Sequence, residues 1–422
     1  MWSGASLGTA ALIVATADPS ENSHRRPVSD RLGPMSRTLA SESRSRPRQR
    51  LLSGMLAVAL ATAACSSTED AGPPSYEPSD AVDVRVLPQL AATGGDVESA
   101  DDAAWVVDAT AAEVDEGTAV TLYAKNEDDA WEAVSEGETD EDGAVALTTR
   151  APGRLHVVVG DGDDAVGAEA STDDAPEASF TDDFDEDTVD EADGNWVSRT
   201  QGYIGVRTCS RTDASAAQVG DGVLTLSVLD DPAKGECRLP GRRKKFTFRL
   251  NGHVGTEGRY GFTYGFAAAR IKTQSARGQH AAFWMQSVGG QQAGGAEKGG
   301  AEIDVMEYFG DDHPEGGLTS FTYFLDKDGE KQTVGGWLPD VEQYGDDWAS
   351  DYHVFSVEWT PEEYVFRIDG QVTQRLEGQT SGREEFLILS LLSSDYELPR
   401  FDGELPQSMQ VDWARVWETG PS

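Results

Sequence analysis

The sequence predicts an all-β protein made of two antiparallel β-sandwiches, a small one followed by a large one. Short runs in which apolar and polar residues alternate recur along the chain, and Gly- and Asp-rich turns separate them. No long stretch has the 3.6-residue apolar period of a helix. The 422 residues are enough for two or three domains with a sizeable core.

Residues 1–64 are expected to be a leader that ends in a signal peptide. Residues 44–50 are basic, and 51–64 are apolar and small, a run too short to span a membrane comfortably as a helix. Cys65 follows two alanines in a pattern that resembles a bacterial lipobox, which predicts lipidation of Cys65. Thr62 stands where Leu or Val is usual, so cleavage by ordinary signal peptidase is the alternative. We expect an exported protein, extracellular or held at the bacterial surface, with membrane contact only through Cys65.

Residues 65–84 are rich in Ser, Asp, Glu and Pro and are predicted to be a disordered tether. Residues 85–172 are predicted to form a small, immunoglobulin-like sandwich. Its alternating runs are 103–109, 118–126, 144–150 and 154–160. The segment has no cysteine pair, aromatic cluster or metal-ligand spacing, which favours a spacer over a binding domain.

Residues 178–418 are predicted to form the large sandwich of two stacked antiparallel sheets. Asp369-Gly370 lies between two alternating runs and indicates a hairpin. The expected strands are 222–229, 261–272, 281–288, 301–309, 317–325, 352–360, 363–372, 386–393 and 409–418. Cys209 and Cys237, an even pair in an exported protein, predict a disulfide, with two free buried thiols as the alternative.

The charge of the chain restricts its partners. With 34 Lys and Arg against 75 Asp and Glu, the formal net charge is −41. Nucleic-acid binding rests on bases that neutralise phosphates, so this composition argues against it. The same charge disfavours sulfated or otherwise anionic polymers and leaves neutral substrates open.

The segment 302-EIDVME-307 places three carboxylates in six residues. Residues two apart in a strand share a face, so Glu302 and Asp304 point the same way, whereas Glu307 would point the opposite way. A β-bulge at Val305–Met306, with Met306 as the extra residue, would return Glu307 to the face of Glu302. Bulges of this kind are frequent beside active sites.

A row of this kind fits the chemistry of a retaining glycosidase. Such an enzyme needs two carboxyls about 5–5.5 Å apart, one a nucleophile and the other an acid and then a base. Asp304, between the glutamates, is placed to hold Glu302 by a hydrogen bond. Crowding of three acids raises at least one pKa, which keeps an acid protonated near neutral pH.

The segment resembles the E-[ILV]-D-x-x-E signature of glycoside hydrolase family 16 in its bulged form. Four further segments resemble that family's strands in the same order: 264-YGFAAARIK-272, 283-FWM-285, 355-FSVEWTPEEYVFRIDG-370 and 411-VDWARVW-417. The resemblance implies a curved, concanavalin-like jelly roll with an open cleft. It also implies endo-acting, retaining cleavage of β-linked glucans or galactans. By the same resemblance Glu302 is the nucleophile, Asp304 its assistant and Glu307 the acid/base.

The strands beside the motif supply candidate substrate-binding residues. Alternation places His280, Trp284 and Gln286 on one face, where Trp284 would stack on a sugar, unless it packs in the core. Arg270 would bond either a cleft carboxylate or a structural partner. The remaining candidates for the cleft wall are two tryptophans in Gly- and Asp-rich loops, Trp337 and Trp348.

The expected activity is hydrolysis of a neutral β-linked polysaccharide by double displacement. The substrate expected first is a β-1,3-glucan. Laminarinases of the family read G-x-W-P-A-x-W-M where this chain has 278-GQHAAFWM-285, which weakens that assignment. The alternatives are a β-galactan or agarose hydrolase, a transglycosylase on the same site, and a non-catalytic glycan-binding protein. We expect a monomer that requires no cofactor; a structural calcium at Asp412 is the one metal expectation.

Overall fold

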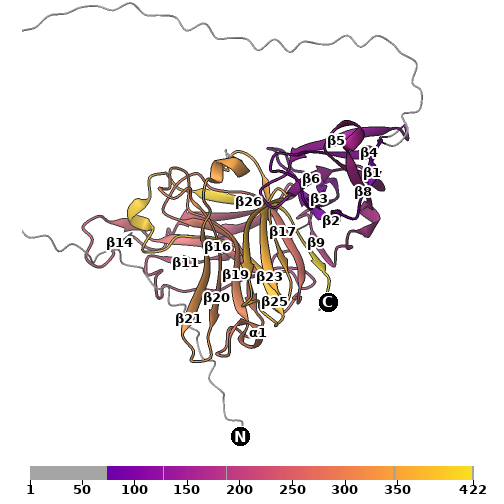
Figure 1. Ribbon diagram of the computed structural model, residues 1–422. Coiled ribbons are helices and arrows are strands. Elements are labelled where there is room, and N and C mark those ends of the chain that lie inside the picture. Colours follow the sequence, from indigo (N-terminus) through magenta and orange to yellow (C-terminus); the bar gives the residue numbers. More distant parts are fainter. Residues whose placement is uncertain (1–73, 127, 187, 346–347, 421–422) are drawn as a thin grey trace, which may run out of the picture. The chain divides into compact units, whose positions relative to one another are not determined.

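The computed structural model describes residues 74–420 except 127, 187 and 346–347. The predicted signal peptide, Cys65 and most of the tether lie outside the described residues. Nearly all regular secondary structure of the described chain is β-strand, and its only α-helix is the four-residue α1 (Ala296–Gly299) (Figure 1). None of the helices within this part is long and apolar enough to cross a membrane. The predicted all-β class is therefore confirmed.

The small sandwich consists of a three-stranded sheet, β2–β3–β6, and a five-stranded sheet, β1–β8–β7–β4–β5. Buried Val107, Leu122 and Val157 belong to the apolar cluster between them. Strand β2 begins at Val82, so the expected boundary of the tether at residue 84 was too late. The bounds are β1 (Glu77–Pro78), β2 (Val82–Ala91), β3 (Ala104–Ala111), β4 (Ala119–Lys125), β5 (Trp131–Glu138), β6 (Ala144–Thr149), β7 (Arg154–Val159) and β8 (Val166–Ser171). Its immunoglobulin-like topology stays a prediction.

The large sandwich is one continuous sheet folded into two layers. The first layer has the order β21–β20–β19–β18–β25, with β21 (Lys331–Trp337), β20 (Leu318–Leu325), β19 (Ala301–Tyr308), β18 (His280–Ser287) and β25 (Glu385–Leu392). The second has the order β13–β26–β17–β22–β23–β24, with β13 (Val223–Asp230), β26 (Gln407–Glu418), β17 (Gly265–Lys272), β22 (His353–Trp359), β23 (Glu363–Ile368) and β24 (Gln371–Glu377). Neighbours along both layers are antiparallel (Figure 1).

Strand β16 (Arg249–Gly255) joins the two layers. Its first half pairs with β13 and its second half with β25. The crossover needs glycine at Gly252, because a Cβ there would lie 2.5 Å from the carbonyl oxygen of Ala216. The short flanking strands are β9 (Phe180–Asp182), β10 (Val197–Ser198), β11 (Ser210–Thr212), β12 (Ala217–Gly220), β14 (Glu236–Cys237) and β15 (Phe246–Thr247).

Alternation along the strands fills the space between the layers with apolar side chains. Phe283, Met285 and Ile303 of the first layer and Val357 and Val411 of the second belong to one buried cluster. All five side chains are fully buried, which is why these strands appear as apolar runs in the sequence. The core therefore lies beneath the first layer, and polar residues of that layer point away from it.

The predicted hairpin at Asp369-Gly370 is confirmed between β23 and β24. Asp369 has φ 47° and Gly370 has φ 84°, which are the positive values that a tight two-residue hairpin turn requires at both positions. Asp tolerates this left-handed backbone and Gly adopts it without a steric cost.

Candidate active site

The three acids of the motif lie on β19, at the centre of the first layer. On the neighbouring β18, Phe283 pairs with Met306 and the next residue, Trp284, pairs with Asp304. Toward β18, Val305 is thus the residue without a partner, in place of the expected Met306. Toward β20, Val305 and Met306 together lie opposite the single residue Ser320, so the bulge is confirmed at Val305–Met306. Val305 and Met306 both pack in the core. The bulge restores Glu307 to the face on which Glu302 and Asp304 lie.

Burial raises the pKa of all three carboxyls and is the largest cause in each case. Repulsion within the row adds to this at Glu302 and Asp304, and the pKa of Asp304 lies well above its ordinary value. No Lys or Arg nitrogen lies within 4.0 Å of these carboxylates among the residues that the structure describes. The row is therefore a cluster of buried acids without a direct Lys or Arg partner.

Three more distant bases favour ionisation of Glu302. Lys331, Arg207 and Arg199 each lower its pKa, against burial and the charge of Glu307. The Nζ of Lys331 lies 3.7 Å from the ring centroid of Tyr323, the residue that pairs with Glu302 on β20. These bases come from two parts of the chain, Arg199 and Arg207 before the motif and Lys331 after it.

The loop that carries Arg207 is tied to a second loop at the end of β25. Asp395 accepts hydrogen bonds from the backbone N–H groups of Thr208 and Cys209, at 2.9 and 3.2 Å. Cys209 forms the predicted disulfide with Cys237, which is confirmed. The guanidinium of Arg207 is 5% exposed and, within the described chain, donates no hydrogen bond to another residue. Arg207 acts on the row through its charge.

At the Glu307 end of the row, His280 lies between two carboxylates. Its Nδ1 is 2.9 Å from Oε2 of Glu397, and its Nε2 is 3.9 Å from Oε1 of Glu307. Thr319 donates a hydrogen bond to the other oxygen of Glu307 at 3.3 Å. His280 is 4% exposed, so it is a buried partner of the acids rather than an open sugar-binding surface.

At the Glu302 end, Trp284 stands beside the row. Its ring stacks on His253 with centroids 6.0 Å apart, and its Nε1 donates to Ser390 at 3.2 Å. Gln286 pairs with Glu302 across the strands and accepts a hydrogen bond from Arg199 at 3.1 Å. Trp284 remains partly exposed, which leaves part of the ring available to a ligand.

An aromatic group continues the row beyond His280. Phe309 is 5.2 Å from the rings of both His280 and Trp337, and His313 stacks on Trp337 at 4.6 Å. Trp337 is 36% exposed and lines a cavity of about 620 Å³. The group offers flat apolar faces of the kind that sugars stack on.

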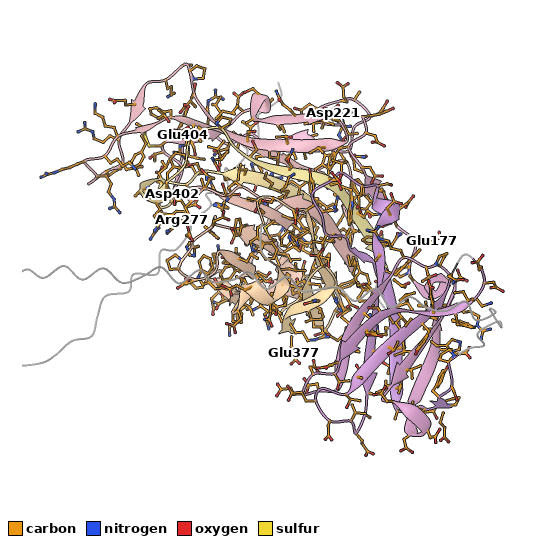
Figure 2. All side chains as sticks on the ribbon, turned by 90° about the horizontal axis from the view of Figure 1, so that it is seen from above. Glu177, Asp221, Arg277, Glu377, Asp402 and Glu404 are labelled. Carbon is orange, nitrogen blue, oxygen red and sulfur yellow. A yellow bond between two sulfur atoms is a disulfide. The ribbon has the colours of Figure 1, made fainter. Side chains whose placement is uncertain are left out.

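Nearby loops close this end of the large sandwich. The backbone N–H of Arg277 donates to Asp402 at 3.0 Å, and Figure 2 shows the two residues together with Glu404. Burial lowers the pKa of His313, and the charge of Arg277 lowers it further. His313 is therefore neutral under conditions in which His280 is charged.

Two candidates from the sequence do not belong to this site. Arg270, on β17 of the second layer, donates to Asp412 and to the carbonyl oxygens of Ala92 and Asp96. Arg270 therefore belongs to a structural ion pair, which was the second of the two partners expected from the sequence. Trp348 is 7% exposed and packs against His353 and Phe355, so it belongs to the core.

The metal expectation finds no support in the geometry around Asp412. Its carboxylate faces the guanidinium of Arg270, and a cation is a poor neighbour for that group. Within the described residues, no group of three or more His, Cys, Asp or Glu side chains could hold a metal ion. A structural calcium therefore stays a prediction from resemblance alone.

The sequence missed four residues that the fold brings to the row: Arg207, His253, Lys331 and Glu397. None of them belongs to a recognisable spacing, since each stands in a different segment. Tertiary structure alone brings them together, and only the alternation of β16 and β21 offered a partial signal.

Comparisons with known proteins place this geometry in context. Residues 216–414 match the family model described as glycosyl hydrolases family 16. The laminarinase catalytic domain from Thermotoga maritima MSB8 is 20% identical over 58% of this chain and 99% of that chain, with a TM-score of 0.44. The laminarinase from Rhodothermus marinus is 21% identical over 58% and 97%, with a TM-score of 0.45. The endo-β-1,3-glucanase from Pyrococcus furiosus is 18% identical over 58% and 96%, with a TM-score of 0.44. No curated protein matches the chain.

Proposed function

We propose that the large sandwich is a catalytic domain of glycoside hydrolase family 16 that cleaves β-linked polysaccharides internally with retention of configuration. The family match over residues 216–414 supports the class of enzyme. The single observation that carries the proposal is the bulged row of Glu302, Asp304 and Glu307 on one face of β19. A row of three buried acids without a direct Lys or Arg partner is costly to the fold, and we take catalysis as the reason to keep it.

The roles of the two glutamates follow the resemblance of the motif to the family signature, in which the first is the nucleophile and the second the acid/base. Burial raises the pKa of both. Lys331, Arg207 and Arg199 favour the carboxylate of Glu302, the form that a nucleophile needs. At Glu307, His280 favours the carboxylate and Glu397 the protonated form, so both states that an acid/base passes through have a neighbour that favours them. In the first step Glu302 attacks the anomeric carbon while Glu307 gives its proton to the departing glycosidic oxygen.

In the second step water restores the enzyme. The carboxylate of Glu307 takes a proton from water, whose oxygen attacks the anomeric carbon and displaces Glu302. Burial and the charges of Glu307 and Glu302 raise the pKa of Asp304 well above its ordinary value, which favours its protonated form. A protonated carboxyl has an O–H that can donate a hydrogen bond to a neighbouring glutamate and hold it in position. Within the described residues, no hydrogen bond joins Asp304 to Glu302 in this structure.

The polymer proposed first is a neutral β-1,3-glucan, with β-galactan and agarose as further candidates. We propose that the protein acts outside the cell or at its surface, anchored through Cys65. The Cys209–Cys237 disulfide supports an exported location, because such bonds form and persist in oxidising compartments.

The decisive test is a reducing-sugar assay on laminarin, mixed-linkage glucan, agarose and a β-galactan. We expect wild-type protein to cleave one of them and Glu302→Gln to lose about 10³-fold or more of that activity. Asp328→Asn is the matched control, because it removes an exposed carboxylate from the turn after β20 and should leave the activity unchanged.

The same assay separates the alternatives. Activity that survives Glu302→Gln would overturn the assigned nucleophile. Transfer of the cleaved chain to an added oligosaccharide, in place of release into water, would identify a transglycosylase. Tight binding of a polymer without any cleavage would indicate a glycan-binding protein.

A further inference from the structure

His280 joins the row to a fourth carboxylate that lies outside the motif. The residue opens β18, and its ring is enclosed on one side by Glu307 of β19 and on the other by Glu397. Phe309 covers the ring at a centroid distance of 5.2 Å. The three groups therefore form a line, Glu397–His280–Glu307, that is almost completely removed from solvent.

Glu397 is fixed independently of His280. Its Oε2 accepts the backbone N–H of Ser394 at 3.2 Å, and its side chain is 6% exposed. This carboxylate accepts the Nδ1–H of His280 at 2.9 Å. The bond orients the imidazole, so that Nε2 is the atom that faces Glu307. A second proton on the ring would be directed at Oε1 of Glu307.

The charged groups around His280 come from every neighbouring element. They are Glu397 from the loop after β25, Glu307 from β19, and Arg207 from the loop before β11. Burial disfavours the imidazolium and Arg207 repels it, but Glu397 and Glu307 outweigh both and raise the pKa of His280. The imidazolium in turn lowers the pKa of Glu307.

We infer that His280, oriented by Glu397, is a positioning residue for Glu307 and supports the carboxylate that Glu307 becomes after giving up its proton. This inference rests on the proposed function of the row. Glu307 alternates between acid and carboxylate in each cycle, and burial makes the carboxylate costly. A fixed imidazolium 3.9 Å away offsets that cost and leaves the proton of Glu307 free to move to the glycosidic oxygen and to return from water.

The first experiment measures the coupling without relying on activity. The imidazole of His280 is titrated by nuclear magnetic resonance in the wild-type chain and in Glu397→Gln, Glu307→Gln and Asp328→Asn. We expect its pKa to fall by about one unit in each of the first two variants, because each removes a facing negative charge. Asp328→Asn should leave it unchanged. An unchanged titration in Glu307→Gln would overturn the inference, whether or not the protein proves to be a glycosidase.

The second experiment measures the consequence for catalysis. His280→Gln removes the positive charge, so the pKa of Glu307 should rise. The alkaline limb of kcat/KM should then move to higher pH by about one unit, while the acid limb set by Glu302 stays in place. A loss of activity that is equal at every pH would show that His280 serves packing alone and would contradict the inference.

The two experiments also separate the inference from the proposed function. Coupling of His280 to Glu307 in a chain that cleaves no polymer would leave the electrostatic pair intact and would refute the proposed activity. Cleavage that depends on Glu302, with no coupling at His280, would refute the positioning role alone. If His280→Gln fails to fold, the titrations of Glu397→Gln and Glu307→Gln still decide the matter.

Discussion

The two layers of the large sandwich bury charge in opposite ways. In the first layer, β19 carries three acids that face one another without a direct basic partner. In the second layer, Arg270 of β17 pairs with Asp412 of β26, and these side chains are 0% and 1% exposed. Arg367 of β23 likewise pairs with Glu358 of β22 and with Asp108. Buried carboxylates thus have Arg partners in the second layer, whereas the three acids of β19 have no direct Lys or Arg partner.

The difference separates a structural use of charge from a functional one. The pairs of the second layer accompany an apolar cluster in which Phe266, Trp413 and Trp417 pack against Leu90 and Val106 of the small sandwich. Arg270 also binds the carbonyl oxygens that follow β2. The small sandwich is therefore held against the large one by a buried contact within the same compact unit. Paired charge orders the fold in the second layer, whereas under the proposed function the acids of β19 transfer a proton.

The largest effect on stability is expected from breaking a compensated pair. Asp412→Ala leaves the guanidinium of Arg270 buried without its carboxylate, and the free energy of unfolding should fall by about 3–5 kcal/mol. Urea denaturation followed by tryptophan fluorescence measures this change. The double variant Arg270→Met with Asp412→Leu should recover most of the loss, because neither charge remains. A single variant as stable as the wild type would remove the contrast between the layers.

A second prediction concerns the pH dependence of stability. Burial raises the pKa of Glu385 to about 8, although Ser381 and Ser287 donate hydrogen bonds to its carboxyl. The folded state then holds a proton that the unfolded state has released, so stability falls as pH rises from about 4.5 toward 8. The contribution of this group approaches about 1.4 kcal/mol per pH unit within that range.

Glu385→Gln should remove this part of the slope. The measurement is thermal unfolding from pH 5 to pH 8 in both proteins, with Asp328→Asn as the control that keeps the slope. Equal slopes in wild type and Glu385→Gln would show that the carboxyl ionises in the fold without a penalty.

A third prediction concerns a buried acid whose removal should stabilise the fold, whereas removal of Asp412 should destabilise it. Asp304→Asn removes a buried carboxyl whose pKa the fold raises well above its ordinary value, so the free energy of unfolding near and above neutral pH should rise by about 1 kcal/mol, while activity falls by about 10²-fold. Denaturation and polymer cleavage measured on the same preparation test both halves. A variant that is less stable and less active would mean that Asp304 serves the fold, and the row would lose its functional interpretation.

The smallest effect is expected at the aromatic end of the first layer. Trp337→Ala removes a partly exposed ring that touches none of the three acids, so we expect KM to rise several-fold while kcat changes little. Initial rates over a range of polymer concentrations test this split. A fall in kcat alone would place Trp337 closer to the reacting bond than the structure does.

Much of the fold followed from local patterns. Alternation located most long strands, and Asp369-Gly370 located a hairpin, because a residue's face and a turn's backbone angles depend on near neighbours. Strands β5, β8, β16 and β21 were missed, since exposed, polar or Gly-containing segments leave at most a partial alternation. Strand β2 was also missed, and Pro- and Asp-rich residues precede it.

In the candidate site, too, local features could be predicted from the sequence and long-range contacts could not. The sequence by itself determined the row on β19 and its bulge, because three acids two and then three residues apart can share one face only if the strand carries an extra residue. Only the tertiary structure decided which residues surround the row. It placed His280 against Glu397 and brought the charge of Arg207 close enough to act on Glu302 and Glu307. It also placed Arg270 in the opposite layer, paired with Asp412. Coulomb interactions and burial depend on distance in space, and distance in the chain does not reveal it.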